Sequence, residues 1–455
     1  MIVATPNFLT ALARNNRPLV YFVEIDTYGK VFTTAAGDPA RKCWIKDGGI
    51  GSISQSVDPV NTSSSLSGFT ITIMDYRRLI TADFPTFLFE GRKVTLKQGF
   101  AGLLEADFIT LWTGVVDTVA SNDDGTTYDF NVVDRNRFNQ QLIYLNGDNG
   151  TPISSTNPKT LLGNPMDMLY SILSTQVGFA DHEIDTATMY AFRDSLWAGV
   201  EFQFRITSAP EAKSFIENEL LKPLGGYGWT DNLGRYTVGF MQPAPGVIAP
   251  VFSFNENNLT AVPVWDEAAL YNTVQYQFDD SSASGGNGFG AETNQISSAS
   301  VNRFGQQGQL TIQSAGVRSG FQGYPLAAMV AQSVFNRYAW KNPLLTLESL
   351  WTPALVVLGD FVSLTHSKIP NRATGALGVA NQLFQVIGKN PDPLKGTIQW
   401  TVVDASTIQA IGTAKIAPAG TPAFTAASAA QKAAYLFVTN DTGKLSDGST
   451  GATFA

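Results

Sequence analysis

Cysteine and histidine are scarce in this chain of 455 residues. Cys43 is the only cysteine, so a disulfide within the chain and an all-cysteine metal site are both excluded. The two histidines, His182 and His366, lie far apart in the sequence, and neither belongs to an H-E-x-x-H pattern. The sequence therefore offers no histidine-based metal site, and we expect no metal and no other cofactor.

Charge is low and acidic. Charged residues make up 15% of the chain, against about 25% in an average soluble protein, and the net charge is −8. Lysine and arginine nowhere form a run. Because sequence-independent binding to DNA or anionic lipid depends on clustered basic residues, we expect the chain to adhere to neither.

Catalytic and targeting motifs are missing too. The sequence has no G-x-S-x-G elbow and no G-x-x-x-x-G-K-[ST] loop, and the glycines at 286, 288 and 290 lie in a serine-rich stretch without a preceding Rossmann strand. The sequence contains no run of 18 apolar residues, which is the pattern that would predict a membrane-spanning helix. The first 18 residues lack the features of a secretory signal, so we expect the chain to be made and to fold in a cytosol.

Alternation of apolar and polar residues dominates from Leu19 to Phe138 and again from Leu344 to Asp404. Phe69–Met74 and Tyr128–Val132 are clear examples, and a period of two is typical of half-buried strands in an antiparallel sheet. The turn residues Asn122–Gly125 separate two such strands and predict a hairpin. The chain is therefore expected to be mainly β.

Two segments carry clear helix start signals. Thr5 precedes Pro6, which predicts a short N-terminal helix with Thr5 as its N-cap. Asn164 precedes a proline and an apolar face that ends at Gly178, which predicts a second helix.

Further signals lie in the middle of the chain. A helix is predicted to begin at Ser208, where Glu211 completes a capping box, and to end at 223–226. Ser281–Ser300 is rich in serine and glycine and predicts a flexible loop. Pro325–Tyr338 predicts another helix.

These patterns predict a mainly β, multidomain chain with a small α+β domain inserted between two antiparallel β domains, for which the resemblance described below implies β-barrels. We expect the following boundaries: an N-terminal helix or arm at 1–18, the first β domain (barrel 1) at 19–143, the α+β domain at 144–250, the second β domain (barrel 2) at 251–404 with a loop and helix insertion at 279–340, and an extended C-terminal arm at 405–455.

Internal repetition is the most informative feature, because self-similarity constrains architecture. Asp129–Asp134 is echoed by Gln399–Asp404, and Gly91–Leu96 by Gly359–Leu364, at nearly the same sequence offset. The strand near Ile71 and the strand at 113–116 have counterparts at 345–347 and 385–387, in the same order. One β-domain used twice would give this pattern.

The repeat assigns structural rather than catalytic roles. We expect the two glycines to occupy equivalent turns where a side chain would clash, and Phe130 and Trp400 to be matching core positions. The predicted repeat-equivalent positions are Gly91 and Gly359, Val94 and Val362, Phe130 and Trp400, and Asp134 and Asp404.

The motifs resemble those of the tail or baseplate hub proteins of tailed bacteriophages, a family with tail-tube-like barrels. The motifs that carry the resemblance are Phe69–Ile73 followed by Asp75, Gly91–Val94, Trp112–Gly114, Val132–Asp134, Leu358–Val362 and the strand ending at Asp404. The resemblance spans roughly residues 19–404. It implies two tail-tube-like β-barrels in one chain and relatedness to the base of secretion-system spikes.

The resemblance also implies a function. Tail tubes are six-fold and tail tips are three-fold, so a trimer with two barrels per chain would form a pseudo-six-fold ring that adapts one symmetry to the other. The implied partners are tail tube, distal tail and central fibre or spike proteins, with DNA passing through the lumen without specific binding and no small-molecule substrate. The implied location is the virion tail tip or baseplate, after assembly in the host cytoplasm.

Two other functions remain open. A cell-wall glycosidase would need two suitably spaced carboxylates, for which Glu105 with Asp107 and Asp266 with Glu267 are the available pairs, although solvated charge is the simpler interpretation. A receptor- or glycan-binding tip module would show grouped exposed aromatics, and Trp229 could stack on a sugar. We expect no enzymatic activity.

Overall fold

The structure is a computed structural model of the chain. It describes residues 2–14, 18–35, 43–62, 64, 68–75, 78–122, 125–135, 140–241, 248–280, 288–371, 375–405, 415–416, 426, 428 and 435–436. The helices are α1 (Pro6–Leu12), α2 (Pro165–Ser171), α3 (Thr186–Ser195), α4 (Ala212–Ser214), α5 (Ser298–Phe304) and α6 (Gly323–Tyr338). Helix α2 continues as a π-helical segment at Ile172–Val177, and α4 continues as one at Phe215–Leu221. Short 3-10 turns lie at 105–107, 181–183, 222–224 and 319–321. No helix in the described part of the chain is long and apolar enough to cross a membrane.

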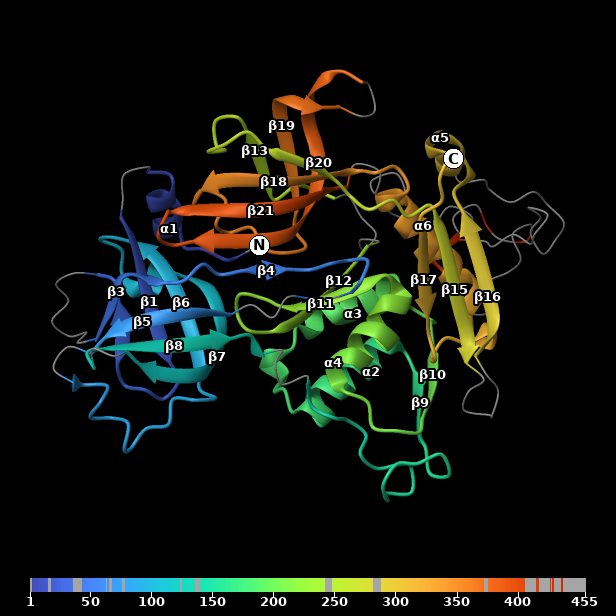
Figure 1. Cartoon of the computed structure of the whole chain (residues 1–455), viewed down its shortest axis with the longest axis horizontal. Helices are drawn as coiled ribbons and strands as arrows, with labels where there is room; N and C mark the ends of the chain where they lie inside the picture. The colour runs from blue at the N-terminus through green and yellow to red at the C-terminus, as the bar shows by residue number, and fades with distance from the viewer. Residues whose placement is uncertain are drawn as a thin grey trace.

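The N-terminal half forms a closed β-barrel, drawn in blue and teal in Figure 1. Its strands are β1 (Leu19–Ile25), β2 (Val31–Thr33), β3 (Cys43–Ile50), β5 (Gly68–Met74), β6 (Lys93–Phe100), β7 (Ile109–Ser121) and β8 (Thr127–Val133). The order around the barrel is β1-β2-β3-β5-β8-β7-β6, and every pair is antiparallel except β2 with β3. The mainly β fold and this barrel agree with the fold class expected from the alternating pattern.

The C-terminal half forms a seven-stranded sheet, drawn mostly in orange in Figure 1. Its strands are β4 (Gln55–Ser56), β13 (Phe252–Asn255), β14 (Val264–Glu267), β18 (Pro343–Leu350), β19 (Phe361–Pro370), β20 (Leu377–Asp392) and β21 (Thr397–Asp404). The order is β13-β19-β20-β21-β18-β14, and β4 joins from the first half to pair with β20. Unlike the first barrel, this sheet is not closed by strand pairing in the described residues.

The chain enters this sheet differently from the barrel. In the first barrel β1 pairs with β6 in the antiparallel sense, whereas β13 pairs with β19 in the parallel sense. The edge strands β13 and β14 follow each other in sequence, and the segment between them makes one bridge, Leu259 to Ser349.

A second hydrophobic core lies beside the two β units. The helices α2 and α3 share it with β12 (Tyr236–Phe240), β9 (Lys159–Gly163) and β10 (Phe202–Ile206). Strand β11 (Gly226–Thr230) pairs with β12 but directs Tyr227 into the core of the β units instead. The sheet of β15 (Thr273–Asp280), β16 (Phe289–Ile296) and β17 (Gln309–Gln313) joins the second core, together with α6. The segment expected as an insertion of barrel 2 therefore packs with the α+β region (Figure 1).

Two local expectations were wrong. Part of the predicted loop Ser281–Ser300 is strand β16, whose residues are alternately exposed and half-buried; polar residues are compatible with such an edge strand because one face stays in water. The helix expected to begin at Ser208 begins at Ala212, and Glu211 is its N-cap without a side-chain capping bond. The segment 281–287 lies outside the described residues.

The other local signals are confirmed. Thr5 accepts a hydrogen bond from the Phe8 amide, and Asn164 caps α2 by accepting from the Met166 amide. Gly178 ends the second helix in the left-handed conformation. Of the expected C-terminal arm, only β22 (Lys415–Ile416), β23 (Tyr435–Leu436), residue 405 and two single residues are described; the rest lies outside the described residues.

Candidate functional site

The two β units pair their corresponding strands in the same register. Ile71 on β5 lies opposite Phe130 on β8, and Leu347 on β18 lies opposite Trp400 on β21. Strand order is also shared, since β6-β7-β8-β5 in the barrel corresponds to β19-β20-β21-β18 in the second sheet. Four consecutive strands therefore occupy the same relative positions in both halves.

The turn before β6 matches the turn before β19. The Gly91 amide donates to the Val116 carbonyl at 2.8 Å, and the Gly359 amide donates to the Val386 carbonyl at 2.8 Å. In return, the Val116 amide donates to the Arg92 backbone carbonyl and the Val386 amide donates to the Asp360 backbone carbonyl, both at 2.9 Å. The two turns have the same hydrogen bonds.

A bulge follows at the same place in each unit. The register shifts between Val116 and Thr118 on β7, and between Val386 and Gly388 on β20. A bulge inserts one residue and bends its strand, so its position is a specific feature of a sheet rather than a consequence of alternation. This shared irregularity makes the correspondence far more specific than strand order alone.

The expected clash at the glycines is found at one position only. Both residues have positive φ, 78° at Gly91 and 83° at Gly359, which favours glycine. A Cβ on Gly91 would meet nothing within 4 Å, whereas a Cβ on Gly359 would lie 3.1 Å from the Trp229 ring. The clash predicted for Gly91 is wrong, and backbone conformation alone accounts for that glycine.

The predicted core residues lie inside their sheets. Phe130 and Trp400 are buried, and so are Val94 on β6 and Val362 on β19. The Trp400 indole donates to the Ser349 hydroxyl at 2.9 Å. In the barrel, the position that corresponds to Ser349 is occupied by the apolar Ile73. The second unit thus carries polar contacts where the first is apolar.

The two aspartates that end the corresponding strands are both buried. Asp134 accepts a hydrogen bond from Thr230 of the β11–β12 hairpin, which ties the barrel to the α+β region. Asp404 pairs with Phe384 at the end of the β20–β21 ladder. The positions correspond, but their surroundings differ.

Segments of both β units form the junction between them. Strand β4 leaves the barrel wall and pairs with β20, with Gln55 opposite Lys389. On either side, the Ile53 amide donates to the Pro391 carbonyl at 3.1 Å and the Val57 amide donates to the Ile387 carbonyl at 2.9 Å. A strand of one unit thereby covers an edge of the other.

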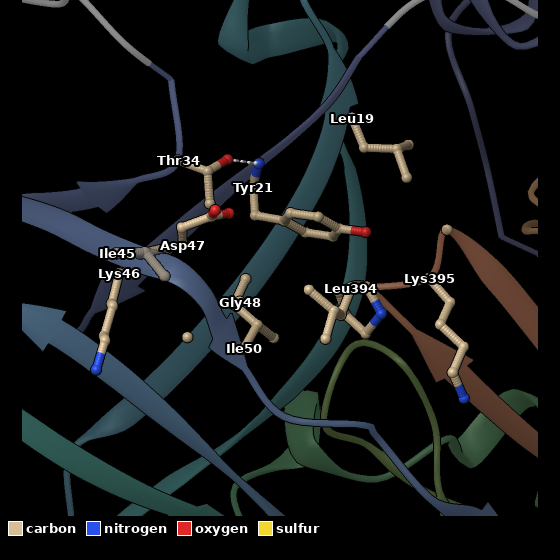
Figure 2. A pocket seen from close by; sticks show the side chains of 13 residues that line it. Leu19, Tyr21, Thr34, Ile45, Lys46, Asp47, Gly48, Ile50, Leu394 and Lys395 are labelled. Atoms are coloured by element: carbon tan, nitrogen blue, oxygen red, sulfur yellow. Dashed lines mark hydrogen bonds between the residues drawn. The ribbon is translucent and has the colours of Figure 1, made fainter.

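Beside β4, the β20–β21 turn reaches back to the barrel. Figure 2 shows Leu394 of that turn on the side of Leu19 and Tyr21 of β1, with the Lys395 side chain directed away from them; these residues line a cavity of about 640 Å³. A Cβ on Gly48 of β3 would lie 3.3 Å from Leu394, so the glycine permits this approach. The turn therefore approaches the barrel closely at Gly48, while a cavity separates the two elsewhere.

Lys389 lies buried at this junction. Its ammonium donates to the carbonyls of Ala354 and Val356 at 2.8 and 2.6 Å and lies 5.4 Å from the Trp400 ring centroid. Burial lowers the pKa of Lys389 to about 7, while Asp360 opposes this shift. The corresponding barrel position is Val119, since Val119 faces Phe130 as Lys389 faces Trp400.

The candidate carboxylate pairs of a glycosidase are engaged in ordinary surface contacts. Asp107 accepts hydrogen bonds from Thr5 and Asn7 of the N-terminal region. Asp266 and Glu267 are exposed on β14, and Asp266 accepts from the Glu267 amide. None of these four carboxylates is buried.

Trp229 and His366, the aromatic and imidazole side chains considered for binding, are engaged in local contacts. Trp229 is half-buried, stacks on Tyr227 and faces the Gly359 turn. His366 is buried and its Nδ1 accepts from the Lys368 amide. Among the described residues no group of three or more histidine, cysteine, aspartate and glutamate side chains could hold a metal ion.

Sequence reasoning did not find the junction. It had no signal for the pairing of β4 with β20, because this pairing depends on two segments that are far apart in sequence. A partial signal was present at Lys389, which is a lysine in a strand otherwise rich in apolar residues.

No family model matches the sequence, and no curated protein matches it. Among solved structures, the chain is similar to the 43 kDa tail protein of prophage MuSo2 from Shewanella oneidensis, with a TM-score of 0.46 and 11% identity over 86% of this chain and 99% of that chain. The prophage tail protein gp18 from Listeria monocytogenes EGD-e gives a TM-score of 0.45 and 9% identity, covering 85% and 94% of the two chains. The tail protein from Neisseria meningitidis MC58 gives 0.45 and 11%, covering 86% and 98%.

All three are tail proteins, which is the class of protein that the sequence motifs resemble. With TM-scores below 0.5 and identities near 10%, these structures assign no role to any residue of this chain. The chain is thus similar in structure to phage and prophage tail proteins.

Proposed function

We propose that the chain is a structural hub of a phage tail. Three copies would present six β units in a pseudo-six-fold ring that joins the hexameric tail tube to a three-fold tip or fibre. The supporting observation is the match of register, glycine turn and bulge between the two units of one chain. A ring of near-equivalent positions needs units that are alike in this way.

The same proposal includes a channel for DNA. The net charge of −8 and the absence of basic runs suit a lumen that does not hold phosphates, because bound phosphates would release counterions and slow passage. Tube, distal tail and fibre or spike proteins would bind at the two ends of the ring. We propose no catalytic activity for the chain.

The domain boundaries expected from sequence enter this proposal with one change. The barrel at 19–143 and the sheet at 251–404 would be the two ring units, and the segment 268–338 would belong with the α+β region because it shares that core. This larger region would lie on one side of the ring and enlarge its outer surface.

Copy number is the decisive measurement. Native mass spectrometry of the full chain, and mass determination of assembled tails, should both give three copies per ring. Six copies, or a chain that stays monomeric at all concentrations and is single in the tail, would contradict the hub. Binding of the isolated chain to host glycans would favour the tip-module alternative instead.

A further inference from the structure

The edge that β4 covers in the second sheet has a counterpart in the barrel. Beyond the bulge, β20 extends past the end of β19, and β4 pairs with it there at Gly388 and Lys389. In the barrel, β7 likewise extends past β6, whose pairing with β7 ends at Val115. Within the described residues no strand pairs with 118–121 on the side away from β8.

The backbone of this β7 segment is oriented for pairing. The backbone N–H of Asn122 donates to the Thr127 carbonyl. In an antiparallel pair, every second residue of a strand is hydrogen-bonded to the same neighbour, so the backbone groups of Ala120 and Thr118 also bond to β8. Val119 and Ser121 therefore direct their backbone groups away from β8. The corresponding residues of β20 are Lys389 and Pro391, and these face β4.

We propose that the β7 edge at Thr118–Ser121 pairs with a strand from a second copy of this chain. The inference rests on the proposed ring. In such a ring the contact from unit 1 to unit 2 within a chain is repeated, in near-equivalent form, from unit 2 of one chain to unit 1 of the next. The intrachain contact puts a strand on the β20 edge, so the interchain contact puts one on the β7 edge.

The strand of the second copy that would pair with the β7 edge follows from the strand register. The Gly51 amide donates to the Thr70 carbonyl on β5, and Val264 of β14 lies opposite Thr346 of β18. Thr70 and Thr346 are corresponding positions, because each lies one residue before the partner of Phe130 or Trp400. Val264 therefore takes the place of Gly51.

Two residues further along, Asp266 takes the register position of Ile53, whose amide donates to the Pro391 carbonyl. Asp266 itself still pairs with Leu344 of β18, so the backbone groups of β14 that face outward there are those of Trp265 and Glu267. The strand that reaches the β7 edge is accordingly β14 with the residues after it. Since Pro391 corresponds to Ser121, the contact places Asp266 of one copy beside Ser121 of the next.

The surface of the second sheet fits this assignment. β14 is an edge strand, and Val264 on it and Val262 just before it are 64% and 54% exposed. Exposed valines on a sheet edge favour pairing with another chain unless something covers them. A copy's β7 edge would cover them.

Two proline variants of the full chain test the edge. Val119→Pro removes an outward amide and leaves every β7–β8 hydrogen bond intact, so the trimer should dissociate at concentrations more than about tenfold higher than for the unmodified chain. Ser121→Pro is the matched control, because Pro391 stands at the corresponding position and still accepts from β4. Dissociation is measured by sedimentation, and unchanged melting of the monomer shows that both variants fold.

A cross-link tests the partner strand. In a Cys43→Ser background, Ser121→Cys combined with Asp266→Cys should give covalent dimers and trimers with a short bifunctional maleimide, and either cysteine alone should not. Hydrogen exchange should be slower at the Val119 amide in the trimer than in the monomer.

The outcomes separate this inference from the proposed function. A trimer with an unprotected Val119 amide, no cross-link and equal behaviour of the two proline variants overturns the edge pairing and leaves the hub. A protected amide without the cross-link also overturns the assignment of β14 as the partner strand. A chain that forms no trimer overturns both proposals.

Discussion

Replacing Trp400 by alanine is the sharpest test of the core of the second sheet. The side chain is 0% exposed, and a buried tryptophan removes about 200 Å² from water, which at about 25 cal/mol per Å² is worth roughly 5 kcal/mol. Alanine retains part of this, while the cavity left behind adds a cost. We expect Trp400→Ala to lower the free energy of unfolding by about 3 to 5 kcal/mol.

The polar contact of the indole contributes little to this number. Ser349, which accepts from the indole, also donates its hydroxyl hydrogen to the Leu350 carbonyl at 2.9 Å. Its hydroxyl therefore keeps one partner in the variant. The loss is mostly apolar burial, together with the contact of the Lys389 ammonium with the ring.

Urea unfolding followed by circular dichroism measures the change, with the m-value as a check that the same surface is exposed in both proteins. Phe130→Ala is the matched variant in the barrel, because Phe130 holds the corresponding register position and is equally buried. It should cost a similar 3 to 5 kcal/mol. A loss below about 1 kcal/mol for Trp400→Ala would refute its placement in the core.

Three further substitutions probe the junction and the turns. The pKa of Lys389 is about 7 in the folded chain and 10.5 in the unfolded chain, so between these pH values the unfolded chain binds more protons than the folded chain. The free energy of unfolding, measured relative to that of Lys389→Met, should therefore rise from pH 7 toward pH 10 by at most about 1.4 kcal/mol per pH unit. Below pH 7 it should not change with pH. A difference between the two proteins that is independent of pH from 7 to 9.5 would show that the amine stays charged. Gly91→Ala should cost only about 1 to 2 kcal/mol for its positive φ, whereas Gly359→Ala should cost more because the added methyl meets Trp229, and equal losses in thermal unfolding would contradict this.

The sequence by itself determined the local structure and the repeat. Alternation placed the strands around Phe69–Met74 and Tyr128–Val132, and the caps at Thr5 and Asn164 are where the chain predicted them. These features depend on neighbouring residues, so they can be read without knowing which strand pairs with which. The echo of Asp129–Asp134 by 399–404 corresponds to strands in the same register.

Partner choice was decided by tertiary structure alone. Periodicity says which side of a strand is buried but not against what, so it could not show that β13 pairs with β19 in parallel or that the second sheet stays open. Polar composition made Ser281–Ser300 look like a loop, although part of it is an edge strand held by β15.

The junction shows the same division most clearly. Gln55 and Lys389 are far apart in sequence, and nothing local indicates that they pair or that the lysine is buried against two carbonyls. The β4–β20 pairing forms only when the chain has brought both units together. The buried amine depends on the folding of the second unit, which brings its two carbonyl acceptors and the Trp400 ring to it.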